Sequence, residues 1–228
     1  MRILHLYPDL MNLYGDYGNI AVLKKHLSDQ GLRVTVDRKD INEVIDFRKY
    51  DFVYMGSGTQ SNQRVALDAF KKYEYMFRIY VDNGGVALFT GNAMELLGNR
   101  IDEADALGIV DFDTETRDAR YTGDVIVNND EIGSVVGFVN KSSLIINGEK
   151  DALFTYEFKD NNLVDNNYEG YRYNNLFGTH IIGPVLVKNP NFMKTIVKLL
   201  VKEDYQEIRY ENEENAYEIN LRELRRRK

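Results

Sequence analysis

The sequence predicts an α/β fold with a central, mostly parallel sheet flanked by helices and with antiparallel β-hairpins added in its second half. Two observations lead to this prediction. In the first half, continuous apolar runs alternate with helical patterns, and in the second half short strand candidates follow one another closely. Strands that are apolar on both faces belong to parallel sheets covered by helices, whereas closely spaced short strands form hairpins or meanders.

The first half of the chain alternates strands with helices. Apolar runs predict strands over Arg2–Tyr7, Asp51–Met55 and Val86–Thr90, and an alternating pattern predicts a short strand over Leu32–Val36. Apolar residues at helical spacing predict helices over 18–28 and 61–81, and a helix start over 91–97. Gly31 is expected to end the first helix.

The second half changes character. The expected strands, which are short and closely spaced, are Thr122–Val127, Ser134–Val139, Ser143–Ile146, Leu153–Phe158 and Leu176–Ile182. A helix is expected over 191–202. Residues 203–228 are densely charged, with a weak apolar stripe at Ile219, Leu221 and Leu224 that predicts a surface helix packed at one edge. Since no repeat or linker interrupts the chain, we expect residues 1–228 to form a single domain.

Charge and hydropathy restrict the classes of function. The net charge of -7 argues against sequence-independent nucleic-acid binding, which needs clustered Lys and Arg. The one basic run, Arg225–Lys228, is expected to be a solvated tail. No stretch reaches the ~18 apolar residues that a membrane helix needs, and the apolar N-terminal run is too short for a signal peptide. We therefore expect a cytoplasmic protein without a membrane span.

Cysteine is absent from the sequence, which excludes disulfides, thiolate zinc sites and thiol nucleophiles. The three histidines, His5, His26 and His180, are widely separated along the chain. A zinc site made of histidines alone would need all three to converge. We therefore expect neither a metal site nor a cofactor.

Three segments follow predicted parallel strands and are therefore candidates for a ligand site at the carboxyl edge of the sheet. They are Asn12–Asn19, Gly56–Thr59 and Thr90–Asn92. The Gly56–Gly58 turn could present N–H groups to an anion. Its alternative interpretation, which the sequence favours, is a tight turn that needs glycine at positive φ.

The segment from Leu88 to Gly98 (LFTGNAMELLG) predicts a nucleophile elbow, in which a strand turns abruptly into a helix. It resembles the elbow of class I (triad-type) glutamine amidotransferases of the cobyric acid synthase type, and in particular the GatD-type glutaminase subunit of lipid II isoglutaminyl synthase. That family shows Cys-Gly-Gly-Tyr-Gln-x-Leu-Gly at this place. Counting back seven residues from Gly98 puts Gly91 at the position of the catalytic cysteine.

Further stretches resemble the family along nearly the whole chain. The matching segments are Asn12–Ile20, Met55–Gly58, Leu107–Phe112, Arg120–Asp124, Val136–Asn140 and Leu176–Pro184. The last is similar to Leu-x-Gly-Thr-Tyr-Leu-His-Gly-Pro, so Ile182 replaces the catalytic histidine and His180 replaces the tyrosine. The resemblance also implies that Gly56, Gly58 and Arg120 occupy binding positions, Arg120 matching the arginine that helps to hold glutamine.

Both catalytic groups of the family are therefore replaced, and hydrolysis of glutamine by the family's mechanism needs both. Glycine at position 91 would relieve the backbone strain of an elbow, which costs about 1–3 kcal/mol for other residues. A substitute dyad of Thr90 and His180 would need the two side chains within hydrogen-bond reach. The alternative is that Thr90 ends a strand and His180 is a partly buried histidine without a chemical role.

Three hypotheses about function follow from the resemblance. The first is a non-catalytic amidotransferase-like subunit, a pseudoenzyme that forms a heterodimer with a Mur-ligase-like, ATP-dependent synthetase in the amidation of the peptidoglycan stem peptide. The second is a stand-alone module that binds an amino acid such as glutamine, or a small anion, through Arg120 and the Gly56–Gly58 loop. The third is an enzyme that uses other residues of the pocket, with Asp16 and Glu95 as candidates.

Overall fold

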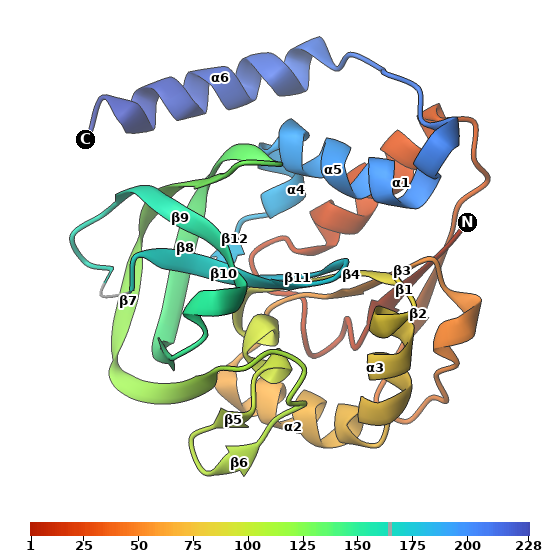
Figure 1. Cartoon of the computed structure of the whole chain (residues 1–228), viewed down its shortest axis with the longest axis vertical. Helices are drawn as coiled ribbons and strands as arrows, with labels where there is room; N and C mark the ends of the chain where they lie inside the picture. Colours follow the sequence, from red (N-terminus) through yellow and green to blue (C-terminus); the bar gives the residue numbers. More distant parts are fainter. Residues whose placement is uncertain (164–165) are drawn as a thin grey trace.

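One mixed sheet forms the centre of the protein (Figure 1). The structure is a computed structural model that describes residues 1–163 and 166–228 of the chain. The strands are β1 (Arg2–Leu6), β2 (Thr35–Lys39), β3 (Phe52–Met55), β4 (Val86–Thr90), β5 (Arg100–Ile101), β6 (Ala104–Asp105), β7 (Asp113–Asn129), β8 (Gly133–Ile146), β9 (Ala152–Lys159), β10 (Tyr168–Tyr173), β11 (Leu176–Thr179) and β12 (Ile181–Ile182). The α-helices are α1 (Tyr17–Asp29), α2 (Gln60–Lys71), α3 (Glu74–Asp82), α4 (Val185–Lys188), α5 (Pro190–Val201) and α6 (Glu211–Arg225). The 3₁₀ turns are η1 (Phe47–Lys49), η2 (Gly91–Leu97), η3 (Glu149–Asp151) and η4 (Lys202–Asp204).

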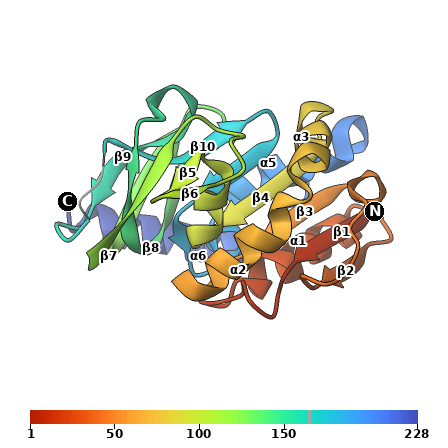
Figure 2. The same cartoon turned by 90° about the horizontal axis from the view of Figure 1, so that it is seen from below.

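The parallel half of the sheet consists of β2, β1, β3, β4 and β11, in that spatial order. Alternate residues of each strand enter two separate cores: Val53 and Met55 of β3 face one, and Phe52 and Tyr54 the other. Helices α2 and α3 cover the first face, and α1, α4 and α5 cover the second (Figures 1 and 2). The predicted α/β class with a central, mostly parallel, helix-flanked sheet is confirmed.

The antiparallel half is dominated by one long hairpin of β7 and β8. The three short strands expected over 122–127, 134–139 and 143–146 lie within these two strands, and the pairing register shifts between Thr116 and Tyr121. β9 forms where it was expected, whereas β10 was not anticipated. β10 completes the sheet by joining β9 to β11, both antiparallel. These strands confirm the added hairpins.

Two expected elements differ in the first half. The single helix predicted over 61–81 is two helices, α2 and α3, and the break brings Phe70 and Phe77 onto the same core with ring centroids 5.2 Å apart. The second strand begins at Thr35 rather than Leu32. This happens because Gly31, at φ +82°, ends α1, and the N–H of Leu32 donates to the carbonyl of Leu27. The first residues of the expected strand are therefore used to leave the helix.

The C-terminal helix α6 lies on the same side of the sheet as α4 and α5 (Figure 1). Its apolar residues Leu221 and Leu224 are buried against Ile126 and Val136 of the long hairpin. Ile219 does not belong to this stripe, since it is 59% exposed. The predicted surface helix is present, but its apolar face is narrower than the sequence suggested.

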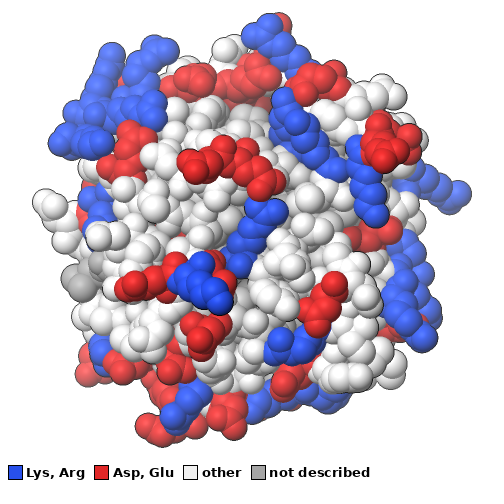
Figure 3. All heavy atoms as spheres, viewed as in Figure 1, with Lys and Arg blue, Asp and Glu red and all other residues white. Residues whose placement is uncertain are grey.

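The basic run 225–228 is not simply a solvated tail. Arg225 donates to Glu157 at 2.9 Å, and Arg227 donates to Asp160 at 2.8 Å. Lys and Arg side chains gather over the C-terminal end of α6, whereas charges of both signs alternate elsewhere on this face (Figure 3). The run therefore fastens α6 to the strands beneath it, which corrects the expectation from sequence.

Candidate functional site

A cavity of about 330 Å³ opens at the carboxyl edge of the parallel strands. It lies where the strand order reverses between β1 and β3, the place at which open α/β sheets bind ligands. Its walls are the segments after β1, β3 and β4 together with the long hairpin. The lining residues are Leu13, Tyr14, Ser57, Gly58, Thr59, Gln60, Ser61, Gln63, Gly91, Asn92, Glu95, Thr116, Arg120, Asn140, Lys141, Ser142, Ser143 and Ile182. All three segments that the sequence singled out therefore contribute to one cavity.

Gly91 stands at the turn from β4 into η2, with φ +58°. Residues with a side chain rarely adopt this left-handed conformation, and an abrupt turn from a strand into a helix is typical of a nucleophile elbow. A Cβ atom built on Gly91 would lie 2.4 Å from Cβ of Ser57 and 3.2 Å from Cγ2 of Ile182. The structure therefore brings Gly91 and Ile182 together at the floor of the cavity. With Ser57 they form a group that we call the elbow cluster.

Ile182 reaches this position because β12 leaves the parallel strands and pairs with β8, with Ile182 opposite Phe138. The apolar run expected as one strand over 176–182 is thus broken at His180 into β11 and β12. This break turns Ile182 toward the elbow and leaves His180 on a separate path. Ile182 is 2% exposed and carries no group that could exchange a proton.

The Gly56–Gly58 loop uses its amides within the protein. The N–H of Ser57 donates to Asp16 at 2.5 Å, and the N–H of Gly58 donates to the side chain of Asn92 at 2.9 Å. Neither glycine has positive φ. A Cβ at Gly56 would lie 2.7 Å from Oδ2 of Asp16, so glycine is needed for close approach of the N-terminal loop. Close packing thus replaces both earlier interpretations, a positive-φ turn and a loop of free amides.

Asp16 lies beneath the elbow and is fully buried. Its Oδ2 accepts hydrogen bonds from both the N–H and the hydroxyl of Ser57, the latter at 2.6 Å. Burial raises the pKa of Asp16 above its ordinary value, against the opposing effect of these hydrogen bonds. Nearby, Thr90 shares a hydrogen bond of 2.8 Å with Tyr54, which also accepts from Asn19.

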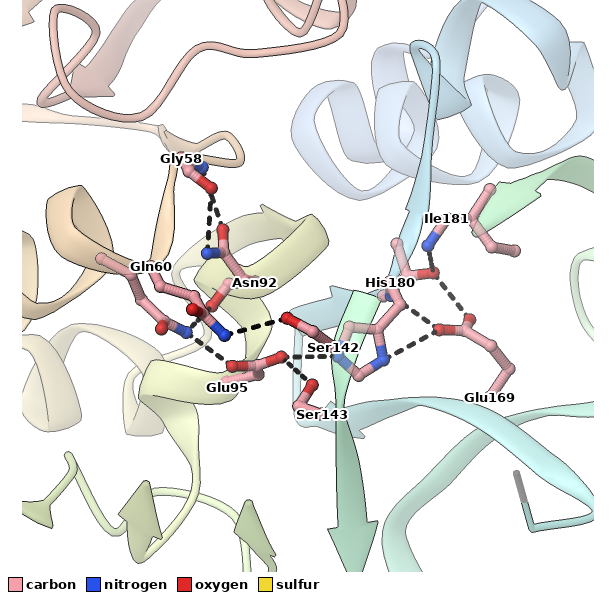
Figure 4. Close-up of polar contacts among 11 residues, drawn as sticks. Gly58, Gln60, Asn92, Glu95, Ser142, Ser143, Glu169, His180 and Ile181 are labelled. Atoms are coloured by element: carbon pink, nitrogen blue, oxygen red, sulfur yellow. Dashed lines mark hydrogen bonds and ion pairs between the residues drawn. The ribbon is translucent and has the colours of Figure 1, made fainter. Parts of the chain in front are cut away.

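A second buried group, the histidine cluster, consists of Glu95, His180 and Glu169 (Figure 4). Nε2 of His180 lies 3.1 Å from Oε1 of Glu95, and its Nδ1 lies 3.9 Å from Oε1 of Glu169. Glu95 also accepts from Gln63 at 2.6 Å and from the hydroxyl of Ser143. Burial alone would raise the pKa of Glu95, but these donors, with His180 foremost, hold it below its ordinary value.

The substitute dyad of Thr90 and His180 is not formed among the described residues. Thr90 hydrogen-bonds to Tyr54, whereas the ring of His180 contacts Glu95 and Glu169. His180 is thus a buried histidine with carboxylate partners. The two carboxylates named as candidates for other chemistry differ in their places, since Glu95 lines the cavity and Asp16 is hydrogen-bonded to Ser57.

Arg120 lies on β7 at the mouth of the cavity and donates to Oδ1 of Asn140 at 2.5 Å. Asn140 donates in turn to the hydroxyl of Tyr14 at 3.2 Å. This arrangement ties the long hairpin to the loop after β1 and leaves the guanidinium exposed at the rim. Arg120 is therefore placed where it could meet a ligand, while Gly56 does not line the cavity.

Across residues 1–163 and 166–228, no group of three or more histidine or acidic side chains could hold a metal ion. His5, His26 and His180 lie in different parts of the fold, with His26 bonded to Glu213 of α6. Within the same residues, none of the helices has the length and hydropathy needed to cross a bilayer.

Sequence reasoning missed Ser57 as a member of the elbow cluster, and it missed Gln63, Ser143 and Glu169 around the histidine cluster. Ser57 stands between two glycines of a segment already singled out, so its place in a tight loop was a usable signal. The other residues belong to no motif. Only the pairing of β10 with β11, the approach of α2 and the position of β8 bring these residues to His180 and Glu95.

Comparisons with known proteins agree with this geometry. Residues 2–190 match the CobB/CobQ-like glutamine amidotransferase domain. The chain is 30% identical over 194 residues to the GatD subunit of lipid II isoglutaminyl synthase (glutamine-hydrolyzing) of Staphylococcus aureus (strain N315), covering 83% of this chain and 79% of that protein. It is also 30% identical over 213 residues to the GatD subunit of Streptococcus pneumoniae (strain ATCC BAA-255 / R6), covering 90% and 82%.

Solved structures share the fold at low identity. A crystal structure of a glutamine amidotransferase has a TM-score of 0.58 at 15% identity and covers 86% of this chain and 98% of its own. PurLQS from Thermotoga maritima has a TM-score of 0.55 at 14% identity, with 96% and 98% covered. The domain match, the two relatives and the elbow at Gly91 lead to one conclusion: the chain belongs to the CobB/CobQ-like glutamine amidotransferase family.

Proposed function

We propose that this protein is a non-catalytic amidotransferase-like subunit that works with a Mur-ligase-like, ATP-dependent synthetase in the cytoplasm. The relatives are named as GatD subunits of lipid II isoglutaminyl synthase (glutamine-hydrolyzing). The synthetase partner of this chain would amidate lipid II with free ammonia rather than with ammonia from glutamine.

The elbow cluster is the observation that carries this proposal. Its nucleophile position is Gly91, its histidine position is Ile182, and the sequence holds no cysteine that another segment could supply. Hydrolysis of glutamine by the family's mechanism needs a thiol next to an imidazole, and neither of these groups stands at the floor of the cavity. The fold and the backbone conformation of the elbow thus persist without the groups that perform the reaction.

Exposed apolar side chains at the cavity mouth, at the start of α1 and on α4 support a docking role. Leu13 and Tyr14 line the mouth, Tyr17 begins α1 with 64% exposure, and Val187 of α4 packs beside Gly18 with 42% exposure. Exposed apolar groups that lie together are typical of protein interaction surfaces. A synthetase docked here would cover the mouth of the cavity.

The catalytic part of the proposal is tested by incubating the purified protein with glutamine and measuring ammonia. We expect no release above the background of glutamine alone. The variants Thr90→Ala and His180→Ala serve as controls, because turnover that either variant abolishes would contradict the proposal and restore the hydroxyl dyad.

The partner is tested by co-expression with a Mur-ligase-like protein and size-exclusion chromatography. We expect a heterodimer whose amidation of lipid II proceeds with ammonium salts and not with glutamine. Tyr17→Glu should weaken the heterodimer, and Tyr75→Glu is the matched control, since Tyr75 is a 73% exposed tyrosine of α3 on the other face of the sheet. Separate elution at micromolar concentration would argue against docking.

A second function, binding of a small molecule without a partner, is favoured by one observation. The cavity of about 330 Å³ is lined mainly by hydroxyl and amide side chains, with Arg120 at its rim. Calorimetric titration with glutamine, glutamate and phosphate tests it. Binding that Arg120→Ala abolishes, in a protein that forms no heterodimer, would favour this second function over the first.

A further inference from the structure

We infer that Ser57 is a third determinant of the inactive pocket, because its side chain occupies the space that a nucleophile on residue 91 would need. This inference rests on the proposed function in one respect, namely that residue 91 stands at the place of the family's nucleophile. It adds that glycine at position 91 and isoleucine at position 182 do not by themselves account for the inactive pocket.

The geometry of the elbow cluster supports this inference. A Cβ on Gly91 would lie 2.4 Å from Cβ and 3.1 Å from Oγ of Ser57. Carbon atoms in contact are separated by about 3.5–4.0 Å, so Ser57 cannot keep its present place if residue 91 carries a Cβ atom. The obstacle is the Cβ atom, which moves only with the backbone, so a rotation of the side chain does not relieve the overlap.

Ser57 is also held firmly where it is. Both its N–H and its hydroxyl donate to Oδ2 of Asp16, and its carbonyl accepts from the N–H of Leu13 at 2.9 Å. Asp16 is fully buried and rests against Gly56, where an added Cβ would lie 2.7 Å from its carboxylate. A shift of Ser57 would therefore disturb a buried carboxylate and two loops together.

Hydrogen bonds between Gly58 and Asn92 also hold the loop of Ser57 close to the loop of Gly91. The Gly58 amide is paired with the side chain of Asn92, the residue after Gly91, and the side-chain amide of Asn92 donates back to the carbonyl of Gly58 at 3.0 Å. This reciprocal pair sets the separation of the two loops. The loops thus cannot spread apart to admit a side chain at residue 91 without losing both hydrogen bonds.

The test restores the thiol and varies only residue 57. The double variant Gly91→Cys with Ile182→His is compared with two triple variants, in which Ser57 is changed to Gly or to Ala. Each is treated with a chloroketone analogue of glutamine, whose carbon forms a bond to the thiolate as chloride leaves with its electron pair. Mass spectrometry then gives the rate of labelling.

The two triple variants separate sterics from hydrogen bonding. Ser57→Ala removes the hydroxyl bonded to Asp16 but keeps the Cβ, whereas Ser57→Gly removes both. We expect the glycine variant to label at least about tenfold faster than the other two, since misplacement of a reacting group by 1 Å can cost about a hundredfold. Equal rates for the glycine and alanine variants would overturn the inference.

A stability measurement decides the matter if a cysteine variant does not fold. Gly91→Ala is introduced into the wild type and into the Ser57→Ala and Ser57→Gly backgrounds, and the fall in melting temperature is recorded. We expect the fall in the Ser57→Gly background to be smaller by about half, because part of the strain at φ +58° remains. The same fall in all three backgrounds would overturn the inference, whereas glutamine hydrolysis by the wild type would contradict only the proposed function.

Discussion

The elbow cluster and the histidine cluster are both buried beside the same cavity, but they differ in what they have kept. The elbow cluster consists of a glycine at positive φ, a serine and an isoleucine, and none of its side chains carries a thiol or an imidazole. The histidine cluster holds two carboxylates and an imidazole, and their hydrogen bonds join η2 to the segment that follows β11 and to β10. Titratable groups near a cavity can thus stabilise a fold through hydrogen bonds, whereas the elbow cluster is defined by a backbone conformation and by close packing.

The largest expected effect comes from removing one partner in the histidine cluster. Glu95→Ala leaves His180, Gln63 and Ser143 without their acceptor, and three buried polar groups left unsatisfied cost at least about 3 kcal/mol in total, at about 1–3 kcal/mol each. Urea denaturation should show a fall in the free energy of unfolding of this size. Glu95→Gln is the matched control and should cost less, because it keeps the shape and one acceptor oxygen. An unchanged stability in Glu95→Ala would break the comparison.

The next effect comes from adding one carbon to the elbow cluster. Gly91→Ala should cost about 3 kcal/mol, the sum of overpacking against Ser57 and a left-handed backbone conformation. Gly31→Ala is the matched control, because Gly31 has φ +82° with open space around its Cβ position. Equal losses in the two variants, measured by urea denaturation, would show that the elbow is strained but not crowded.

A smaller effect, dependent on pH, is expected at His5, whose Nε2 has no hydrogen-bond partner among the described residues. Burial lowers the pKa of His5 to about 4, with Arg38 adding to the effect and Asp9 opposing it. Between this pKa and the ordinary pKa of histidine, His5 is therefore protonated in the unfolded chain and neutral in the folded chain. Stability is full above a pH of about 6.5 and is lost as the pH falls toward 4, by about 2 kcal/mol between about pH 7 and 5. His5→Leu should flatten this part of the profile in urea titrations, and an unchanged slope would contradict the assignment.

The smallest effect is expected at the exposed charges of α6. Arg225 donates to Glu157 and lowers the pKa of that carboxyl to about 2. Because Arg225 is exposed, Arg225→Ala should cost less than about 1 kcal/mol and should be screened by salt. Arg226→Ala, which removes only a pair within the helix, is the control and should change nothing measurable. A loss at Arg225 as large as that at Glu95 would remove the distinction between buried and exposed pairs.

Much of the fold follows from local patterns. The apolar runs at Val86–Thr90 and Asp51–Met55 predict central strands, since only a sheet covered on both faces accommodates them. The prediction of a single helix over 61–81 was wrong at its middle, because the amphipathic pattern of the sequence continues through the break at residues 72–73. There the packing of Phe70 against Phe77 overrides the local preference for one helix. The broken strand at His180 has the same origin, since β12 follows β8 rather than its own chain neighbour.

The candidate site divides in the same way. By itself the sequence determined that it contains no cysteine, and it predicted that Gly91 and Ile182 occupy the family's catalytic positions and that three loops share one edge of the sheet. Only the tertiary structure decided that Ser57 fills the space above Gly91, that the loop amides are used internally, and that His180 contacts Glu95 rather than Thr90. The physical reason is that residue type and spacing are properties of one segment. The separation of two loops, by contrast, is set by the packing of all the strands and helices between them.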